Sequence, residues 1–444
     1  MVLVWQLLLV LLLSVLRFYP YPELVIYPYL RSLDWLPYSQ ILDQHFPGLL
    51  FFPVNLHSLG FIDPQSLKVL LLILVLFQSA FIYRIARHWL PVFLFTLWQP
   101  FFEGNQLWIE TFLAAFTLPA WWFFSQRKWL ISGLFLGLGV VFKQTLVPLV
   151  ILGGVYLLYK YRWQGVAALF WFGLGAILPS LVMLTYLWHI GVIKEFWFWT
   201  IEFNLTAYAA GARLAPTLGQ WLKLSWPMFI VGLGWWRLRR MRLLIGWILI
   251  SSLGAVARFG FVHLQPAVPF FCLLYAAVVQ NFWQSKKWLA VAVVIPSLVW
   301  AGWFYAHQSS FGGINFYSSN EVQIVEAITS RMNPGEKIFL LGVNPHIYQL
   351  SSTVPAGNVF VFQFPWFLQV AGPMVLAGLA ADRPRLIVYD SQSVIDGQYL
   401  KDYAAYLVDY TVNNYQPVQR IGSVTIYVSS QRKNDTFSQN SLAL

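Results

Sequence analysis

Charged side chains are scarce in this sequence. Asp, Glu, Lys and Arg make up 10% of its 444 residues, whereas 59% are hydrophobic and the mean hydropathy is +0.62. Soluble domains carry about 25% charged residues, so this composition excludes an ordinary soluble protein. The single cysteine, Cys272, excludes an intramolecular disulfide and argues against a cysteine-based metal site. The GxxxxGK[ST] loop, the HExxH helix and the GxSxG elbow are also absent, so the mechanisms tied to them have no support.

Long apolar runs dominate the first 306 residues and predict a mostly α, polytopic helical membrane protein with about eleven transmembrane helices. The first run has neither a basic flank nor a small-residue cleavage site, so we expect a retained anchor rather than a removed signal peptide. The runs cover residues 2–17, 66–84, 88–102, 107–124, 128–143, 145–159, 164–189, 219–236, 243–257, 264–283 and 287–306.

Basic residues gather in alternate connections between these runs. The basic connections contain Arg84, Arg87, Arg127, Lys128, Lys160, Arg162, Arg237, Arg239, Arg240, Arg242, Lys286 and Lys287, and they contain no Asp or Glu. Because basic loops face the cytoplasm, we expect a cytoplasmic N-terminus, an extracytoplasmic first loop at residues 18–65 and a location in the plasma membrane. Arg17 is a local exception to this pattern. The same distribution of charge argues against a nucleic-acid partner, although the net charge is +11.

The composition changes near residue 307. The segments KIFLLGV, NVFVFQF, RLIVYDS and SVTIYVS have the character of strands, and EVQIVEAITSRM and GQYLKDYAAYLVDYTV have that of helices. Alternating strands and helices predict a small extracytoplasmic α/β domain at residues 307–430. The polar stretch 431–444 predicts a disordered tail.

The first external loop carries acidic residues beside the membrane, which is a costly placement and often a functional one. Glu23 lies close to the end of the first apolar run, where a lipid phosphate would be, and a carboxylate there can act as a base on an acceptor hydroxyl. Asp43 and His45 are reasonable ligands for a divalent cation that bridges to phosphate. We expect the intervening segment LVIYPYLRSL to form a helix in the membrane interface. The alternative is that these residues are hydrated loop charges.

Other polar residues lie at the outer ends of later runs. Glu110, in FFEGNQLWIETFL, needs a partner or a water-filled cavity at that depth. A fixed cation at Lys143, beside Gln144, suits a phosphate oxygen or a buried carboxylate, and Arg258 with His263 suits a phosphate or pyrophosphate leaving group. The alternative for the lysine and the glutamate is an interfacial side chain that extends to water.

Taken together, these segments resemble the GT-C glycosyltransferases of the dolichyl-phosphate-mannose protein mannosyltransferase and aminoarabinose lipid A transferase type. PYLRSLDWLPYSQILDQHFPGL is similar to the first external loop of that family, and GNQLWIETF to its second acidic element. SGLFLGLGVVFKQT is similar to a span end with lysine, and RFGFVHLQPAVPF to a late histidine-containing element. The resemblance covers most of the chain. Two departures stand out, because the acidic pair is reduced to Pro22-Glu23 and Gln40 occupies the place of the usual aspartate.

The resemblance implies an inverting transfer of a sugar from a polyprenyl-phosphate donor to an acceptor at the extracytoplasmic face. The implied catalytic residues are Glu23, Asp43 and Glu110, with either Glu23 or Asp43 as the base. The implied donor phosphate ligands are Lys143, Gln144, Arg258 and His263. One divalent metal ion on Asp43, His45 and Glu110 is an optional cofactor. The sugar and the protein, lipid or glycan nature of the acceptor stay open.

Two other classes of protein are alternatives. A polar-lipid transporter or flippase would carry charges near the middle of its spans and broken helices in paired halves, which the sequence lacks. A non-catalytic scaffold with a decayed catalytic loop would bind a partner through the α/β domain. Asp390 and Asp396 follow a predicted strand, and we interpret both as loop-capping residues.

Overall fold

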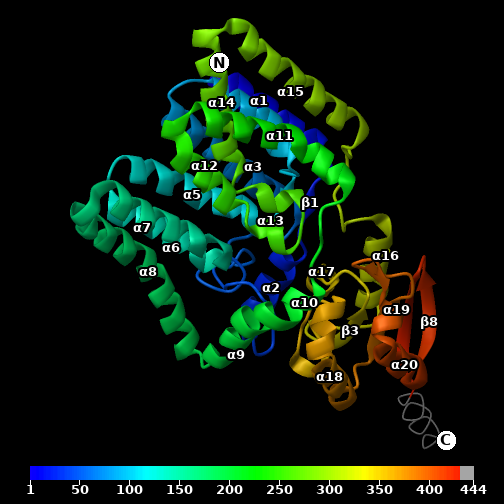
Figure 1. Ribbon diagram of the computed structural model, residues 1–444. Helices are drawn as coiled ribbons and strands as arrows, with labels where there is room; N and C mark the ends of the chain where they lie inside the picture. The colour runs from blue at the N-terminus through cyan, green and yellow to red at the C-terminus, as the bar shows by residue number, and fades with distance from the viewer. Residues whose placement is uncertain (431–444) are drawn as a thin grey trace, which may run out of the picture.

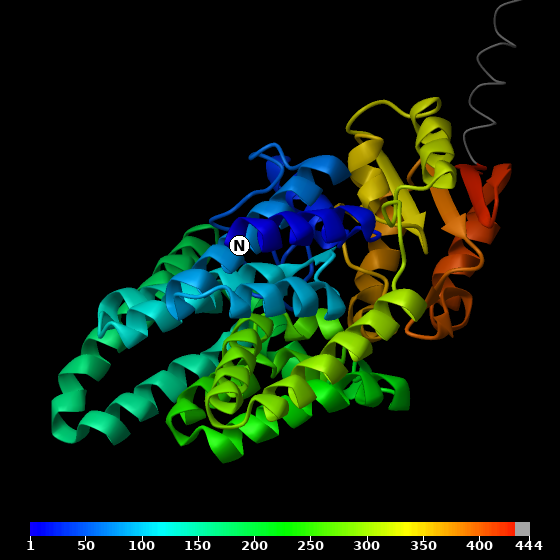
Figure 2. The same cartoon turned by 90° about the horizontal axis from the view of Figure 1, so that it is seen from above.

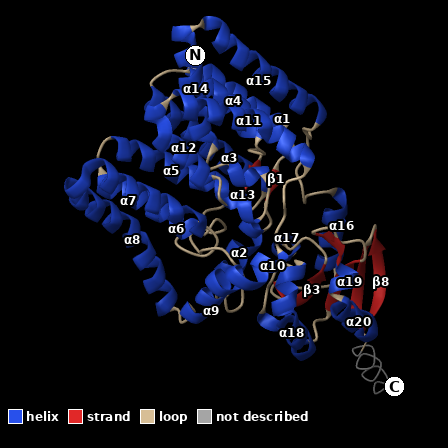
Figure 3. Ribbon diagram, viewed as in Figure 1, coloured by secondary structure: helices blue, strands red, loops and turns tan. Residues whose placement is uncertain are grey.

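The computed structural model describes residues 1–430, and the predicted disordered tail lies outside the described residues. The chain is mostly helical, and Figure 3 shows its strands concentrated in the C-terminal region. A helical body formed by the first 307 residues lies beside this region, which occupies one end of the molecule (Figures 1 and 2). The helices of the body are α1 (Val2–Val15), α2 (Glu23–Ser32), α3 (Pro64–Ala86), α4 (Leu90–Phe101), α5 (Ile109–Ser125), α6 (Trp129–Phe142), α7 (Val147–Tyr161), α8 (Gly165–His189), α9 (Ile193–Trp197), α10 (Ala209–Gly211), α11 (Leu218–Arg237), α12 (Arg242–Ser251), α13 (Gly254–Ala257), α14 (Val268–Ser285) and α15 (Lys287–His307).

Each of the eleven predicted apolar runs overlaps at least one of these helices, and the run 243–257 is divided between α12 and α13. Within residues 1–430, three helical stretches are both long and apolar enough to cross a membrane: Pro64–Ala86, Gln144–His189 and Lys287–His307. Others are shorter than the roughly 20 residues that a span needs, and α1, α4 and α6 have 14, 12 and 14 residues. The count of about eleven spans is therefore not confirmed, although a membrane protein fits these helices.

Small residues bring α6 and α8 into close contact. A Cβ atom added at Gly137 of α6 would lie 2.4 Å from the carbonyl oxygen of Ala176 on α8, and one added at Gly175 would lie 2.1 Å from that of Leu130. Such approach of two backbones is typical of helix pairs in membranes. Lys143 follows the last residue of α6 and begins the connection to α7.

The first loop is packed into the protein rather than lying on its surface. The residues Leu24 to Leu30 of α2 are all buried, so the helix does not expose the apolar face that an interfacial helix needs. The loop is fastened to the body, since the backbone oxygen of Gln44 accepts hydrogen bonds from Gln144 Nε2 (3.0 Å) and Asn204 Nδ2 (2.9 Å). In Figure 1, α2 lies on the side of the helical body that faces the sheet region.

The C-terminal region contains a five-stranded sheet in the order β4-β3-β5-β9-β8. Strand β3 runs parallel to β4 and β5, and β9 runs antiparallel to β5 and β8. Three predicted strands are confirmed as β3, β5 and β9, and the predicted helices as α16 and as α19 with α20. The strands are β3 (Lys337–Leu341), β4 (Val354–Pro355), β5 (Leu386–Asp390), β6 (Val394–Ile395), β7 (Gln398–Tyr399), β8 (Tyr415–Ile421) and β9 (Val424–Ser429), and the helices are α16 (Ser319–Thr329), α17 (His346–Leu350), α18 (Pro365–Asp382), α19 (Leu400–Tyr403) and α20 (Ala405–Asn414).

The predicted strand NVFVFQF, at residues 358–364, is wrong. This segment does not join the sheet but pairs through an isolated bridge between Phe360 and Ile41 of the first loop. Phe360 N donates to Gln40 O (2.7 Å), and Leu42 N donates to Phe360 O (2.9 Å). The strand-like pattern of the segment is satisfied by this distant partner, and the bridge ties the sheet region to the first loop.

Candidate functional site

Two short parallel strands bring the first two acidic elements together. Strand β1 (Tyr19–Pro20) pairs with β2 (Gln106–Leu107), with Pro20 opposite Leu107. Glu23 follows β1 and is the first residue of α2, and Glu110 follows β2 in the first turn of α5. Neighbouring strands lie about 4.8 Å apart, so this pairing brings the N-termini of α2 and α5 close together.

Glu23 has a carboxylate oxygen without a partner. The residue is half-buried, whereas its Oε2 atom is shielded from solvent and makes no hydrogen bond. The pKa of Glu23 is raised to about 8, because burial and the negative charge of Asp43 together outweigh a hydrogen bond from its own backbone that lowers it. A carboxyl group with such a pKa exchanges a proton near neutral pH, as a general base must.

Glu110 is the centre of a buried charge cluster. The residue is 1% exposed, and its Oε1 atom accepts from both Lys143 Nζ and His263 Nδ1. Lys143 follows the last residue of α6, and His263 lies in a turn at Phe261–Leu264 before α14. Glu110, Lys143 and His263, which were predicted from separate segments, thus meet at the Oε1 atom of Glu110. The second carboxylate oxygen of Glu110, Oε2, is buried without a partner.

Asp43 is held by the first loop itself. Its Oδ2 atom accepts from the hydroxyl of Tyr27 (2.7 Å), and its Oδ1 atom accepts from the backbone N–H of His45 (2.6 Å) and lies 2.9 Å from His45 Nδ1. Asp43 is 2% exposed, so both oxygens are committed to internal partners. This arrangement suits a residue that orders the loop rather than a free base.

Trp108 links these groups. Its ring lies 4.5 Å from that of Tyr21, two residues before Glu23, and 5.5 Å from that of His45. Trp108 itself lies two residues before Glu110. Trp108 therefore connects the segment before Glu23 with His45 and stands in the segment before Glu110. Trp108 is not among the predicted site residues. Its position, between β2 and the N-terminus of α5, is a feature of the fold.

The remaining predicted phosphate ligands are already engaged. Gln144 binds the backbone of Gln44, as described above. The Arg258 guanidinium forms a two-pronged ion pair with Asp396 of the sheet region, with Nη1 to Oδ2 at 2.9 Å, and Trp366 Nε1 also donates to Oδ2 (3.2 Å). The interpretation of Asp396 as a loop cap is wrong, because its partner is this distant arginine. Asp390 does cap its loop, since its Oδ1 atom accepts from Gln392 N (3.0 Å).

The three predicted metal ligands are divided between two clusters. Asp43 binds His45, whereas Glu110 binds Lys143 and His263. Over residues 1–430, no three His, Cys, Asp or Glu side chains are grouped so that they can hold a metal ion. The described residues thus do not fit the predicted ion.

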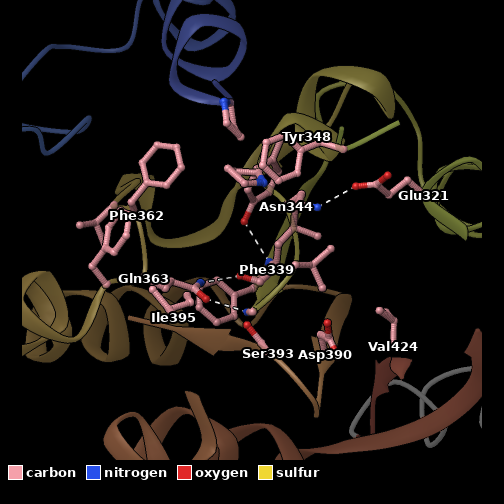
Figure 4. Close-up of a pocket in the computed structure, with 18 of the residues that line it drawn as sticks. Glu321, Phe339, Asn344, Tyr348, Phe362, Gln363, Asp390, Ser393, Ile395 and Val424 are labelled. Atoms are coloured by element: carbon pink, nitrogen blue, oxygen red, sulfur yellow. Dashed lines mark hydrogen bonds between the residues drawn. The ribbon is translucent and has the colours of Figure 1, made fainter. Parts of the chain in front are cut away.

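A cavity of about 910 Å³ separates the first loop from the sheet region. Of the predicted site residues, Glu23 is the one that lines it; the Asp43 and Glu110 groups lie outside its wall. Most of the lining comes from the sheet region (Figure 4).

Comparison with known proteins gives no match: no protein-family model fits the chain, and no curated protein matches it.

Proposed function

We propose that the protein is a membrane glycosyltransferase of the GT-C type, which moves a sugar from a polyprenyl-phosphate donor to an acceptor at the extracytoplasmic face with inversion. The observation that supports the proposal is the pairing of β1 with β2, which brings the N-termini of α2 and α5 close together, where Glu23 and Glu110 lie. Glu23 then faces a cavity, and Glu110 holds two potential cations.

In the proposed reaction, Glu23 takes the proton of the acceptor hydroxyl. The acceptor oxygen forms a bond to the anomeric carbon of the donor while the bond from that carbon to the phosphate oxygen breaks. The products are the glycosylated acceptor, polyprenyl phosphate and protonated Glu23. Its raised pKa and unpartnered Oε2 favour Glu23 over Asp43 as the base, because both oxygens of Asp43 are bonded internally.

Lys143 and His263 stabilise the departing phosphate in this mechanism. Glu110 holds both side chains in place, so their donors need little rearrangement when charge develops on the leaving group. Arg258 is not assigned to this step, because it pairs with Asp396 of the sheet region and not with the Glu110 cluster. We assign Arg258 to the attachment of the sheet region instead.

The test uses full-length protein purified in nanodiscs. Polyprenyl-phosphate mannose, glucose and aminoarabinose serve as donors, and membranes from a strain lacking this protein serve as the source of unmodified acceptor. Formation of polyprenyl phosphate and of labelled product is measured for the wild type and for Glu23→Ala, Asp43→Ala and Glu110→Ala. We expect transfer by the wild type and a deep loss in Glu23→Ala and Glu110→Ala. Full transfer by all three variants contradicts the proposed site.

A further inference from the structure

The cavity lies at the point where the winding of the sheet reverses. After β3 the chain passes through α17 to β4 on one side of β3, and it then passes through α18 to β5 on the other side. The cavity is lined by residues directly after β3 (Gly342, Val343 and Asn344) and directly after β5 (Gln392 and Ser393). In open α/β sheets, ligands bind outside the carboxyl ends of the strands at such a reversal.

The two loops at this edge are built for close approach. Gly342 has φ +71°, a conformation that other residues rarely adopt, and a Cβ atom there would lie 2.7 Å from the Cβ of Ser393. Gln363 fixes the first loop end, since its Oε1 atom accepts from Gly342 N (2.7 Å) and its Nε2 atom donates to Leu340 O (2.6 Å). Figure 4 shows Gln363 and Ser393 at the same end of the cavity.

The opposite wall comes from the first external loop. Tyr19, Tyr21, Pro22 and Glu23 line the cavity, and the blue ribbon above it in Figure 4 belongs to the N-terminal part of the chain. Glu23 belongs to this wall, and its unpartnered Oε2 atom is shielded from solvent. A ligand in the cavity would therefore contact both the sheet region and the proposed base.

The chemistry of the lining excludes an anion. No Lys, Arg or His lines this cavity among the described residues, whereas four carboxylates do: Glu23, Glu321, Asp390 and Asp396. Asn344 Nδ2 donates to Glu321 Oε1 (2.7 Å), so amide and carboxylate groups are already oriented there. The aromatic lining residues are Tyr19, Tyr21, Phe316, Phe339, Tyr348, Phe360, Phe362 and Phe364.

We propose that this cavity binds an uncharged saccharide. Carboxylates and amides bind hydroxyl groups, aromatic rings stack on the C–H faces of a sugar, and the volume lies within the usual range of about 300–1,000 Å³ for small-molecule sites. The saccharide presents a hydroxyl to Glu23 and is the acceptor; this last assignment rests on the proposed function, whereas binding itself does not.

The test measures binding and transfer separately in the full-length protein. The probes are methyl glycosides of mannose, glucose, galactose and N-acetylglucosamine and their disaccharides, with mannose 6-phosphate and glucosamine as charged comparisons. Saturation-transfer NMR detects binding to the wild type, to Ser393→Tyr, which fills the cavity, and to Gln392→Ala at its rim. The matched controls are Ser330→Tyr and Gln369→Ala, at exposed positions outside the cavity wall.

We expect a neutral glycoside to bind the wild type and both controls, and Ser393→Tyr to weaken it at least about tenfold. Gln392→Ala gives a smaller loss. Equal binding by Ser393→Tyr and the wild type, binding of mannose 6-phosphate alone, or the absence of neutral binding overturns the inference. Saccharide binding without any transfer supports the inference and contradicts the proposed function. Transfer without saccharide binding supports the proposed function and contradicts the inference.

Discussion

Glu23 and Glu110 occupy matching positions in the fold, because each follows by three residues one member of a parallel pair, Pro20 and Leu107. The two carboxylates have opposite surroundings. Glu23 lines a cavity and has one buried oxygen without a partner, whereas Glu110 is bound by Lys143 and His263. The same backbone arrangement thus provides a group that can change protonation and a group that holds cations. This difference is the basis of the roles proposed for them.

The stability of the protein depends on pH through Glu23. Its folded pKa of about 8 lies above the ordinary value of 4.5, so the folded state binds the proton more tightly than the unfolded state. Its contribution therefore favours the folded state below pH 4.5 and is lost as the pH rises through 8. We expect Glu23→Gln to have a higher Tm than the wild type at pH 9 and a smaller difference at pH 5, measured by thermal unfolding in nanodiscs.

The control for this prediction is Glu202→Gln, which changes an exposed glutamate. Its Tm difference from the wild type is expected to stay the same at both pH values. If Glu23→Gln also shows a constant difference, the carboxyl group of Glu23 does not have the raised pKa on which its assignment as base depends.

The Glu110 cluster is predicted to act as a unit. Lys143→Met removes one partner of a buried carboxylate and is expected to lower the free energy of unfolding by about 3–5 kcal/mol. The double variant Lys143→Met/Glu110→Gln removes the buried charge as well, so it should be more stable than Lys143→Met alone. Chemical denaturation in mixed micelles measures both. The two side chains are not in contact if the double variant loses as much stability as Lys143→Met and Glu110→Gln lose together.

The pair of Arg258 and Asp396 is predicted to fasten the sheet region to the helical body. A double-mutant cycle with Arg258→Gln and Asp396→Asn should give a coupling energy of about 0.5–3 kcal/mol, as for residues in direct contact. We also expect each variant to increase cleavage between the two regions in limited proteolysis. A coupling energy of zero, with unchanged proteolysis, shows that the ion pair does not hold the regions together.

His346 is expected to make the sheet region sensitive to acid. Its side chain is 1% exposed, and both ring nitrogens are buried without hydrogen bonds. Burial lowers its pKa from 6.5 to about 4, although the negative charge of Glu321 opposes this. The folded state thus favours the neutral ring, and stability is lost as the pH falls from 6.5 through 4.

His346→Phe keeps an aromatic ring beside Tyr317 and removes the titration. We expect the Tm of this variant to fall less than that of the wild type between pH 6.5 and 4.5. His307→Phe, at an exposed histidine, is the matched control and should follow the wild type. A wild-type pH dependence in His346→Phe refutes the assignment.

The sequence predicted the parts of this fold that depend on local pattern. The eleven apolar runs are helical because apolar composition is a property of a short segment, and β3, β5 and β9 follow from continuous apolar runs in the same way. Residues 358–364 were misassigned because the partner of Phe360 is Ile41, more than 300 residues away in the chain. No local pattern carries that information.

The candidate site shows the same division. Glu23, Glu110, Lys143 and His263 were found individually, because ionisable residues at the ends of apolar runs are conspicuous. Their grouping was not predictable, since it depends on the β1–β2 pairing and on the packing that places His263 beside α5. The role of Arg258 was missed for a related reason. Its partner Asp396 has a position that is typical of loop caps.

The most direct test of the account is the pH dependence of sugar transfer by the wild type and Glu23→Gln. Label is followed from polyprenyl-phosphate donors to membranes from a strain lacking the protein, with Glu202→Gln as the control. The account predicts that wild-type kcat/KM rises with pH to a plateau above about 8, and that Glu23→Gln lowers it by about 10²–10⁴-fold and removes the rise. Unchanged transfer by Glu23→Gln, with the wild-type pH profile, would contradict the assignment of Glu23 as the base.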